Sequence, residues 1–267
     1  MSAVDTALAG LQARPAARRW RRAGLVLALL AFYAACWRLA DIDLARLASG
    51  LPKMGRWIVS AWPPAWAELP TFLLRTAETV AMAALGTTAA VLLAVPMAVL
   101  AARNITPWPR AVGPARLLLN ALRGIDSFVF ALLFVAAVGL GPFAGVLGIA
   151  LHTWGSAAKN FADHLENVSL EAFEAVRSTG ASRSMALAYA VLPDVLPVML
   201  STALFWWEFN VRASTVLGVV GAGGIGQELK SSMDLLDFPR LFTIIAVIVV
   251  VVTLLDRFSG WLRRRLT

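Results

Sequence analysis

The chain is poor in the residues that carry most protein chemistry. Its 267 residues include one cysteine, Cys36, two histidines and only 15% charged residues. A single cysteine excludes a disulfide within the chain. The histidines and carboxylates show no spacing typical of a metal site, and no motif pairs a nucleophile with a base. No loop has the glycine and lysine spacing that binds the phosphates of ATP. The sequence therefore predicts neither a catalytic centre nor a metal or cofactor of its own.

Apolar residues are abundant instead. They make up 59% of the chain, and the mean hydropathy is +0.73. This is more apolar surface than one soluble core buries, so lipid is the expected solvent. The net charge of +8 comes from basic residues that bracket apolar segments, without an aromatic and basic pattern typical of nucleic-acid binding. The sequence predicts an all-α integral membrane protein and no nucleic-acid partner.

Long apolar runs predict the membrane spans. A transmembrane helix needs about 20 mostly apolar residues. We expect about six spans, at residues 22–39, 76–101, 116–138, 143–160, 194–217 and 241–261. The first resembles a secretory signal, but a retained helix is preferred because further spans follow. Basic residues concentrate in the connections that would lie on the same side as both termini, which predicts a multi-pass protein of the bacterial cytoplasmic membrane with both termini in the cytoplasm.

The chain divides into two expected parts. Residues 1–70 hold a cytoplasmic arm, the first span and a segment, 41–70, whose tryptophans, prolines and few charges are typical of an interfacial helix on the outer surface. Residues 71–267 form the core domain, with a cytoplasmic loop at 161–193. In that loop, Glu171 to Thr179 predicts a helix that Gly180 ends, and Ser182 predicts the cap of a second helix. Pro193 is expected to disfavour helix at Leu192.

This loop resembles the "EAA" loop of permease subunits in bacterial ATP-binding-cassette (ABC) importers. The residues that carry the resemblance are Glu174, Ala175, Gly180, Ala181, Leu192 and Pro193. The resemblance implies the fold of a type I ABC importer permease, in which the loop is a coupling helix that docks on an ATPase subunit. The alternative is an ordinary loop whose glycine and proline only stop helices.

The stretch GAGGIG, residues 221–226, has the glycine spacing of a dinucleotide site. Such a site needs a preceding β-strand, whereas here a membrane-length apolar helix precedes it. Gln227 stands where a phosphate-binding loop requires lysine. We interpret Gly221, Gly223, Gly224 and Gly226 as backbone that leaves the helix and approaches other helices or a solute closely, at the mouth of a pathway.

The run NVRASTVLGVVGAGGIGQEL resembles the phosphonate importer permeases, and methionine importer permeases share the glycine cluster but less of the arginine-containing part. The likeness extends over most of the chain beyond residue 70, except for WGSAAKNFADHLENVSL. It implies transport of phosphonate or a similar oxyanion, such as phosphite or phosphate, with two ATPase subunits that bind ATP and Mg²⁺, a second permease (an identical chain or a close paralogue) and an extracytoplasmic phosphonate-binding protein. The chain itself is expected to have no enzymatic activity.

Charged residues inside the spans mark the expected path. Glu208 and Arg212 lie four residues apart on one helix face, with Asn210 beside them. Two interpretations remain open: a structural ion pair, or an arginine that provides positive potential for an anionic solute. Arg123 and Asp126 are expected to form a similar pair. For His152, packing with a hydrogen bond is favoured over a pH-sensitive role.

A permease for another small solute, such as methionine, is an alternative within the same class, and two alternatives from other classes remain. A membrane oxidoreductase that uses GAGGIG would need a strand before residue 221 and would bind nucleotide. A secondary transporter would move solute without an ATPase partner, and it would leave the EAA loop unexplained.

Overall fold

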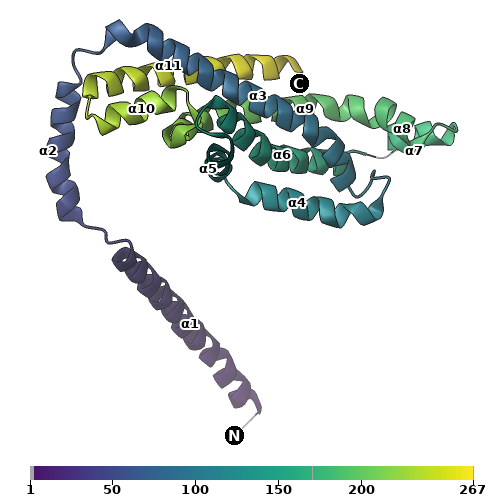
Figure 1. The fold of residues 1–267 in the computed structure, drawn as a ribbon. Helices are drawn as coiled ribbons and strands as arrows, with labels where there is room; N and C mark the ends of the chain where they lie inside the picture. Colours follow the sequence, from purple (N-terminus) through teal and green to yellow (C-terminus); the bar gives the residue numbers. More distant parts are fainter. Residues whose placement is uncertain (1–2, 170, 267) are drawn as a thin grey trace. The chain divides into compact units, whose positions relative to one another are not determined.

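The computed structural model describes the backbone of residues 3–169 and 171–266, and the side chains of 21–169 and 171–265. Within these ranges the chain is helical and contains no strand (Figure 1). It divides into two compact units, Met1–Trp57 and Ile58–Thr267. The expected all-α fold is confirmed.

The first unit holds α1 (Ala3–Leu39) and most of α2 (Leu44–Ser60). Residues 21–39 of α1 are long and apolar enough to span a membrane. Asp43 accepts a hydrogen bond from the N–H of Ala45 at 2.9 Å, which caps the start of α2. Leu47, Leu51 and Met54 recur on one face of α2 at helical spacing, and its basic residues lie on the other. The helix expected in 41–70 is present, while its place on the outer surface stays a prediction.

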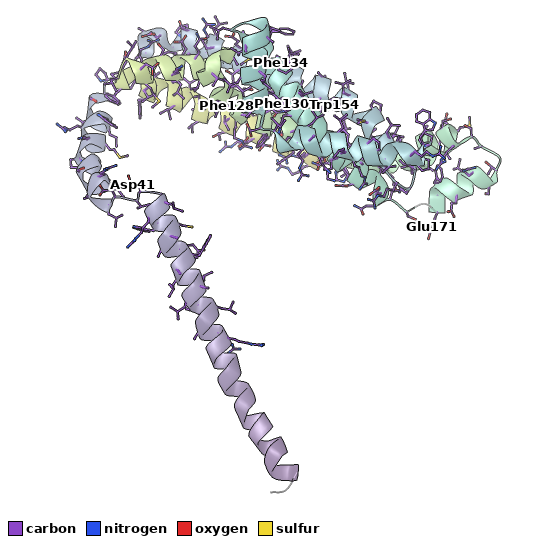
Figure 2. The ribbon with its side chains drawn as sticks, turned by 60° about the horizontal axis from the view of Figure 1, so that its bottom comes forward. Asp41, Phe128, Phe130, Phe134, Trp154 and Glu171 are labelled. Atoms are coloured by element: carbon purple, nitrogen blue, oxygen red, sulfur yellow. The ribbon has the colours of Figure 1, made fainter. Side chains whose placement is uncertain are left out.

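The second unit is built around α6 (Pro142–Glu166). This helix packs against the four helices α3 (Leu69–Ala101), α4 (Val112–Gly124), α5 (Ser127–Val138) and α9 (Leu192–Leu217). Small residues permit the close approach. A Cβ at Gly148 would lie 2.9 Å from Cα of Ala131, and one at Gly155 would lie 2.6 Å from Cβ of Leu122. Figure 2 places Trp154 of α6 and Phe130 of α5 in the middle of this unit.

Two further helices of this unit, one of 10 and one of 29 residues, follow α9. The helices α10 (Ile225–Asp234) and α11 (Phe238–Leu266) pack together, and α10 is anchored through Ile225, which is buried with Phe72 and Ile244. The two short helices α7 and α8, described below, lie at one end of the unit, whereas α10 lies toward the other (Figures 1 and 2).

The expected third span, 116–138, is wrong as a single straight helix. The chain breaks between α4 and α5, whose axes differ by 86°. Ile125 is extended, and the Asp126 carboxylate accepts the N–H of Phe128 at 2.8 Å, so it caps α5. Because the break separates them, Arg123 and Asp126 do not form the expected ion pair. His152 lies 2.8 Å from the Ile125 carbonyl oxygen through Nδ1 and is 9% exposed, so it is a packed, hydrogen-bonded histidine.

Length and hydropathy alone do not identify all six expected spans. Four helical stretches of the described chain are long and apolar enough to cross a membrane, or five if the bent pair α4 and α5 counts as one span. The helix α6 is not among them. It carries His152, Thr153, Ser156 and Lys159, and it is surrounded by protein, so it needs a less apolar surface than a lipid-facing helix. The expected spans 76–101, 194–217 and 241–261 lie within α3, α9 and α11.

Candidate functional site

The loop with the EAA pattern forms a helix, a turn and a second helix. The helix α7 covers Glu171–Ser178, and α8 covers Arg183–Ala186. Gly180 has φ of +87°, a left-handed conformation that glycine adopts without strain. The Ser182 hydroxyl accepts the N–H of Met185 at 3.3 Å and caps α8. The helix, the glycine turn and the serine cap are confirmed.

The expectation that Pro193 disfavours helix at Leu192 is wrong. After α8 the chain continues through a π-helical turn, Leu187–Val191, and enters α9 at Leu192, which has helical φ and ψ of −61° and −43°. Pro193 lies in the first turn of α9, where backbone N–H groups have no partner within that helix. The N–H that proline lacks is therefore lost at little cost. The loop is therefore continuous with α9.

The loop is anchored on one side and open on the other. Phe173, Ala186 and Val191 are buried in the same apolar cluster as Phe161 and Leu165 of α6. The residues that carry the EAA resemblance are exposed, except for Ala181, which is half-buried; they are Glu174, Ala175, Gly180, Leu192 and Pro193. The loop thus has a fixed base and a surface that a partner can contact.

An ion pair stabilises the end of α6, the helix on which the base of this loop packs. Glu166 accepts the Arg103 N–H at 2.6 Å and the Arg116 guanidinium at 2.6 Å, and Arg116 also donates to the Ala101 carbonyl oxygen at 2.9 Å. Partial burial alone would raise the pKa of Glu166, but these two donors and their positive charge outweigh it and lower the pKa below its ordinary value. Glu166 therefore joins α6 to the loop after α3 and to α4.

The glycine segment breaks the helix, as its composition predicts. After α9 a short π-helical turn, Gly218–Ala222, leads into α10. Gly221, Gly223 and Gly224 have φ of +92°, +79° and +70°. A Cβ at Gly226 would overlap the Thr215 carbonyl oxygen. The predicted close backbone approach is confirmed.

No strand precedes GAGGIG in the described chain, because residues 192–217 are α9. The dinucleotide interpretation is therefore wrong. Gly221 also lines a cavity of about 540 Å³, together with Gln227, Lys230 and Asp234 of α10. The glycine segment thus borders an open space, and its role in a solute path stays a prediction.

The predicted pair Glu208 and Arg212 belongs to a longer series of charges. The Arg212 guanidinium donates to Glu208 at 2.8 Å and to Asp256 of α11 at 3.4 Å. The second oxygen of Glu208 accepts the Arg263 guanidinium at 2.6 Å. Charges alternate in the order Asp256, Arg212, Glu208, Arg263. The two α11 residues were not identified from the sequence, because only the packing of α9 on α11 brings them near.

Asn210 is wholly buried and faces protein. Its amide nitrogen donates to the hydroxyls of Thr87 at 2.8 Å and Thr153 at 2.9 Å. It thereby joins α9 to α3 and α6. In this state its amide is enclosed, so the geometry supports a packing role more than contact with a solute.

A second ion network near the start of α3 was also missed. Arg240 of α11 binds Glu68 at 2.9 Å and Glu228 of α10 at 3.2 Å, and Glu228 lies 3.6 Å from Arg75. Arg75 pairs with Glu78 at 3.0 Å. The spacing of Arg75 and Glu78 indicates their pair, but no spacing indicates the other contacts, because they join different helices. They hold α10 in place beside the glycine segment.

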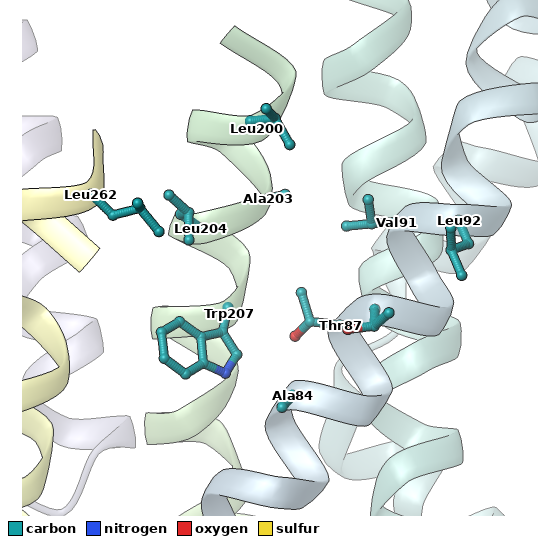
Figure 3. A pocket seen from close by; sticks show the side chains of 10 residues that line it. Ala84, Thr87, Val91, Leu92, Leu200, Ala203, Leu204, Trp207 and Leu262 are labelled. Carbon is teal, nitrogen blue, oxygen red and sulfur yellow. The ribbon is translucent and has the colours of Figure 1, made fainter. Parts of the chain in front are cut away.

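An apolar cavity of about 510 Å³ lies between α3, α9 and α11 (Figure 3). Val91 and Leu92 of α3 face Leu200 and Leu204 of α9 across it. Its lining is mostly aliphatic, and its polar groups are confined to Thr87, Thr88 and Trp207.

Comparison with known proteins identifies the chain. Residues 71–267 match the family described as "Binding-protein-dependent transport system inner membrane component". The chain belongs to this family. As a binding-protein-dependent permease, it is similar to the phosphite transport system permease protein PtxC of Stutzerimonas stutzeri, with 41% identity over 92% of this chain and 90% of that protein. It is also 41% identical to the phosphate-import permease protein PhnE of Mycolicibacterium smegmatis, over 71% of this chain and 36% of that protein.

Solved structures place this permease in the same fold. The methionine ABC transporter MetNI, described in inward facing conformations, has a chain that matches with a TM-score of 0.66 at 20% identity, over 76% of this chain and 99% of that chain. The permease is therefore a multi-pass membrane protein with the type I ABC importer fold, and the ATPase activity of such a system lies in a separate subunit.

Proposed function

We propose that the chain forms the membrane path of an ATP-driven importer for phosphite, phosphonate or a related phosphorus oxyanion. The names of the similar proteins support this class of solute. The alternating charges of Asp256, Arg212, Glu208 and Arg263 add support, because groups of this kind at membrane depth face protein or water, where an anion can pass.

The observation that carries the proposal is the exposed EAA loop. Its anchored base and exposed Glu174 and Ala175 suit contact with a separate ATPase. We infer two ATPase subunits, a second permease and an extracytoplasmic binding protein that delivers the solute. ATP and Mg²⁺ bind to the ATPase, and this chain holds no cofactor and catalyses no reaction. Both termini lie in the cytoplasm, as the distribution of basic residues predicts.

The test is purification of the tagged chain in mild detergent with whatever subunits accompany it. We expect two copies of an ATPase and two permeases by native mass measurement. The same preparation in liposomes, with its binding protein, should take up phosphite or methylphosphonate only when ATP is present on the side of the membrane that the ATPase faces. Uptake by the isolated chain without an ATPase would contradict the proposal and indicate a secondary transporter.

A further inference from the structure

A polar cavity of about 420 Å³ lies between the end of α6, the first half of α9 and the end of α11. It is much larger than the ~30 Å³ that one water occupies in the liquid. Its polar lining residues are Asn160, Asp163, His164, Asn167, Ser201, Thr202 and Arg263. Polar groups in this number would be costly against hydrocarbon, so the cavity faces water or a hydrophilic solute.

The lining has hydrogen-bonding groups that the protein does not use. Neither the Asn160 amide nor the Ser201 hydroxyl has a hydrogen-bond partner among the described residues. Thr202 is occupied instead: it donates to the Val198 carbonyl oxygen at 2.9 Å, and its oxygen lies 3.0 Å from His164 Nε2. Asn160 and Ser201 therefore remain available to a bound molecule from opposite helices.

The charges of the cavity favour one type of anion. Arg263 provides a guanidinium that Glu208 holds at 2.6 Å, so the cation is fixed in position and partly neutralised. Asp163 adds a carboxylate, which accepts hydrogen bonds and repels a fully ionised dianion. A tetrahedral oxyanion that keeps one P–OH group suits both the guanidinium and the carboxylate. Its oxygens accept hydrogen bonds from Asn160, Ser201 and Arg263, and its hydroxyl donates one to Asp163.

The cavity lies next to the loop with the EAA pattern. Asn160 and Asp163 are on the last turns of α6, shortly before α7, and Ser201 is on α9 shortly after Leu192. Since the expected cytoplasmic side holds this loop, the cavity belongs to the cytoplasmic half of the path. Arg263 joins it to Glu208 and Arg212, the charged residues predicted for the path.

We propose that this cavity is a binding site for a monoprotonated phosphorus oxyanion, phosphite or an alkylphosphonate, on the cytoplasmic half of the path. The site rests on the proposed function, because it assumes that the chain transports such an anion. Asn160 and Ser201 donate hydrogen bonds to the solute, Arg263 supplies the positive charge, and Asp163 selects the protonated anion over sulfate.

The test uses the complete transporter, purified with its ATPase, and two readouts. Equilibrium binding of radiolabelled methylphosphonate is measured in detergent without the binding protein, and uptake is measured in liposomes with it. Asn160→Leu and Ser201→Ala should each weaken binding about tenfold, the effect of losing one hydrogen bond to a charged group. The control Thr253→Val removes an exposed hydroxyl on α11 that bonds only to the Val249 carbonyl oxygen, and it should change neither readout.

Asp163→Asn tests the selectivity separately. It removes the negative charge but keeps an oxygen acceptor, so sulfate should compete with methylphosphonate at least several-fold better than in the wild type. Two outcomes separate the site from the proposed function.

If the wild type takes up the solute and Asn160→Leu and Ser201→Ala bind and transport it normally, the site is overturned and the proposed function stands. If Asn160→Leu weakens binding but the transporter takes up no phosphorus oxyanion, the site is supported and the proposed function is contradicted.

Discussion

At the scale of single residues, Glu208 of α9 pairs with two arginines. Its side chain is 14% exposed, and its two oxygens bind Arg212 and Arg263. The spacing of four residues predicts the pair with Arg212, but Asp256 and Arg263 are 44 and 55 residues away from their partners and no local pattern indicates them. Local pairs can thus be predicted from the sequence, whereas networks between helices depend on packing.

The network changes what a charge exchange should do. In a simple pair, Glu208→Arg with Arg212→Glu would restore the attraction. Here the exchange places arginine beside Arg263 and glutamate beside Asp256, so like charges meet. We expect the double variant to be no more stable than either single variant. Its unfolding midpoint should lie several degrees below that of the wild type, because ~1 kcal/mol moves the midpoint of a domain of this size by about 2–4 °C.

Thermal unfolding of the purified protein in detergent measures this effect. Reversal of all four charges, with Asp256→Arg and Arg263→Glu added, restores the alternation and should recover part of the loss. If the double exchange alone regains wild-type stability, the contacts to α11 contribute nothing and the charges act as an isolated pair.

Glu166 gives a prediction for pH. Its pKa is lower in the folded protein than in the unfolded chain, so its contribution to stability is complete above the ordinary glutamate pKa of about 4.3 and is lost as pH falls through the lowered value. Glu166→Gln should lower the free energy of unfolding at pH 7 by about 1.5–3 kcal/mol, the range for hydrogen bonds to a charged group. As the pH falls through the lowered pKa of Glu166, the variant and the wild type should converge.

The measurement is thermal unfolding between pH 3 and pH 8. The control is Glu174→Gln on the exposed face of α7, which should leave stability unchanged across the range. A constant difference between Glu166→Gln and the wild type at every pH would show that the charge of Glu166 is not what stabilises this end of α6.

At the scale of elements, the apolar helices α3, α9 and α11 follow from run length alone. The break between α4 and α5 does not follow from run length. From the sequence, Asp126 can be an ion-pair partner within one helix or the cap of a new helix, and the structure shows the cap. Leu192 and Pro193 show the same ambiguity, since a proline closes one helix or opens the next. Apolar runs predict that a helix exists, and tertiary packing decides where it bends.

The glycine segment allows a test of close packing. In Gly226→Ala the added methyl group would overlap the Thr215 carbonyl oxygen, which is backbone and cannot move aside. We expect a loss of about 1–3 kcal/mol, as for other overpacked sites. Gly113→Ala in α4 is the matched control, because its Cβ would meet no atom within 4 Å, and it should leave stability unchanged or raise it slightly. Equal effects of the two changes on the unfolding midpoint would contradict the packing interpretation.

The turn between α7 and α8 allows a test of coupling. Gly180 is exposed and a Cβ there would meet no atom within 4 Å, but φ of +87° disfavours a side chain, a β-branched one most. Gly180→Val should therefore change the shape of the exposed loop without disturbing the buried Phe173. We expect the number of ATP molecules hydrolysed per solute transported to rise several-fold, as measured in liposomes. Gly180→Asn tolerates this conformation better and should stay close to the wild type. Unchanged coupling in Gly180→Val would refute a coupling role for the loop.

At the scale of the whole molecule, length and hydropathy alone find four or five of the six expected spans. The helix α6, expected as the fourth span, falls below that measure because it packs among other helices and has little need of an apolar outer surface. The side of the membrane on which each connection lies still depends on charge distribution, which the sequence supplies and the fold alone does not. The EAA loop can bind a cytoplasmic ATPase only if it lies on the cytoplasmic side of the membrane.

Cysteine labelling decides this arrangement. Cys36→Ser removes the natural thiol, and Glu174→Cys and Lys230→Cys then place single thiols at exposed positions of α7 and α10. A membrane-impermeant maleimide should label Lys230→Cys in intact cells, but should label Glu174→Cys only after the membrane is opened. The Cys36→Ser protein is the control and should stay unlabelled. Labelling of Glu174→Cys in intact cells would put the EAA loop outside, where no ATP-driven motor can bind it, and the proposed importer mechanism would fail with it.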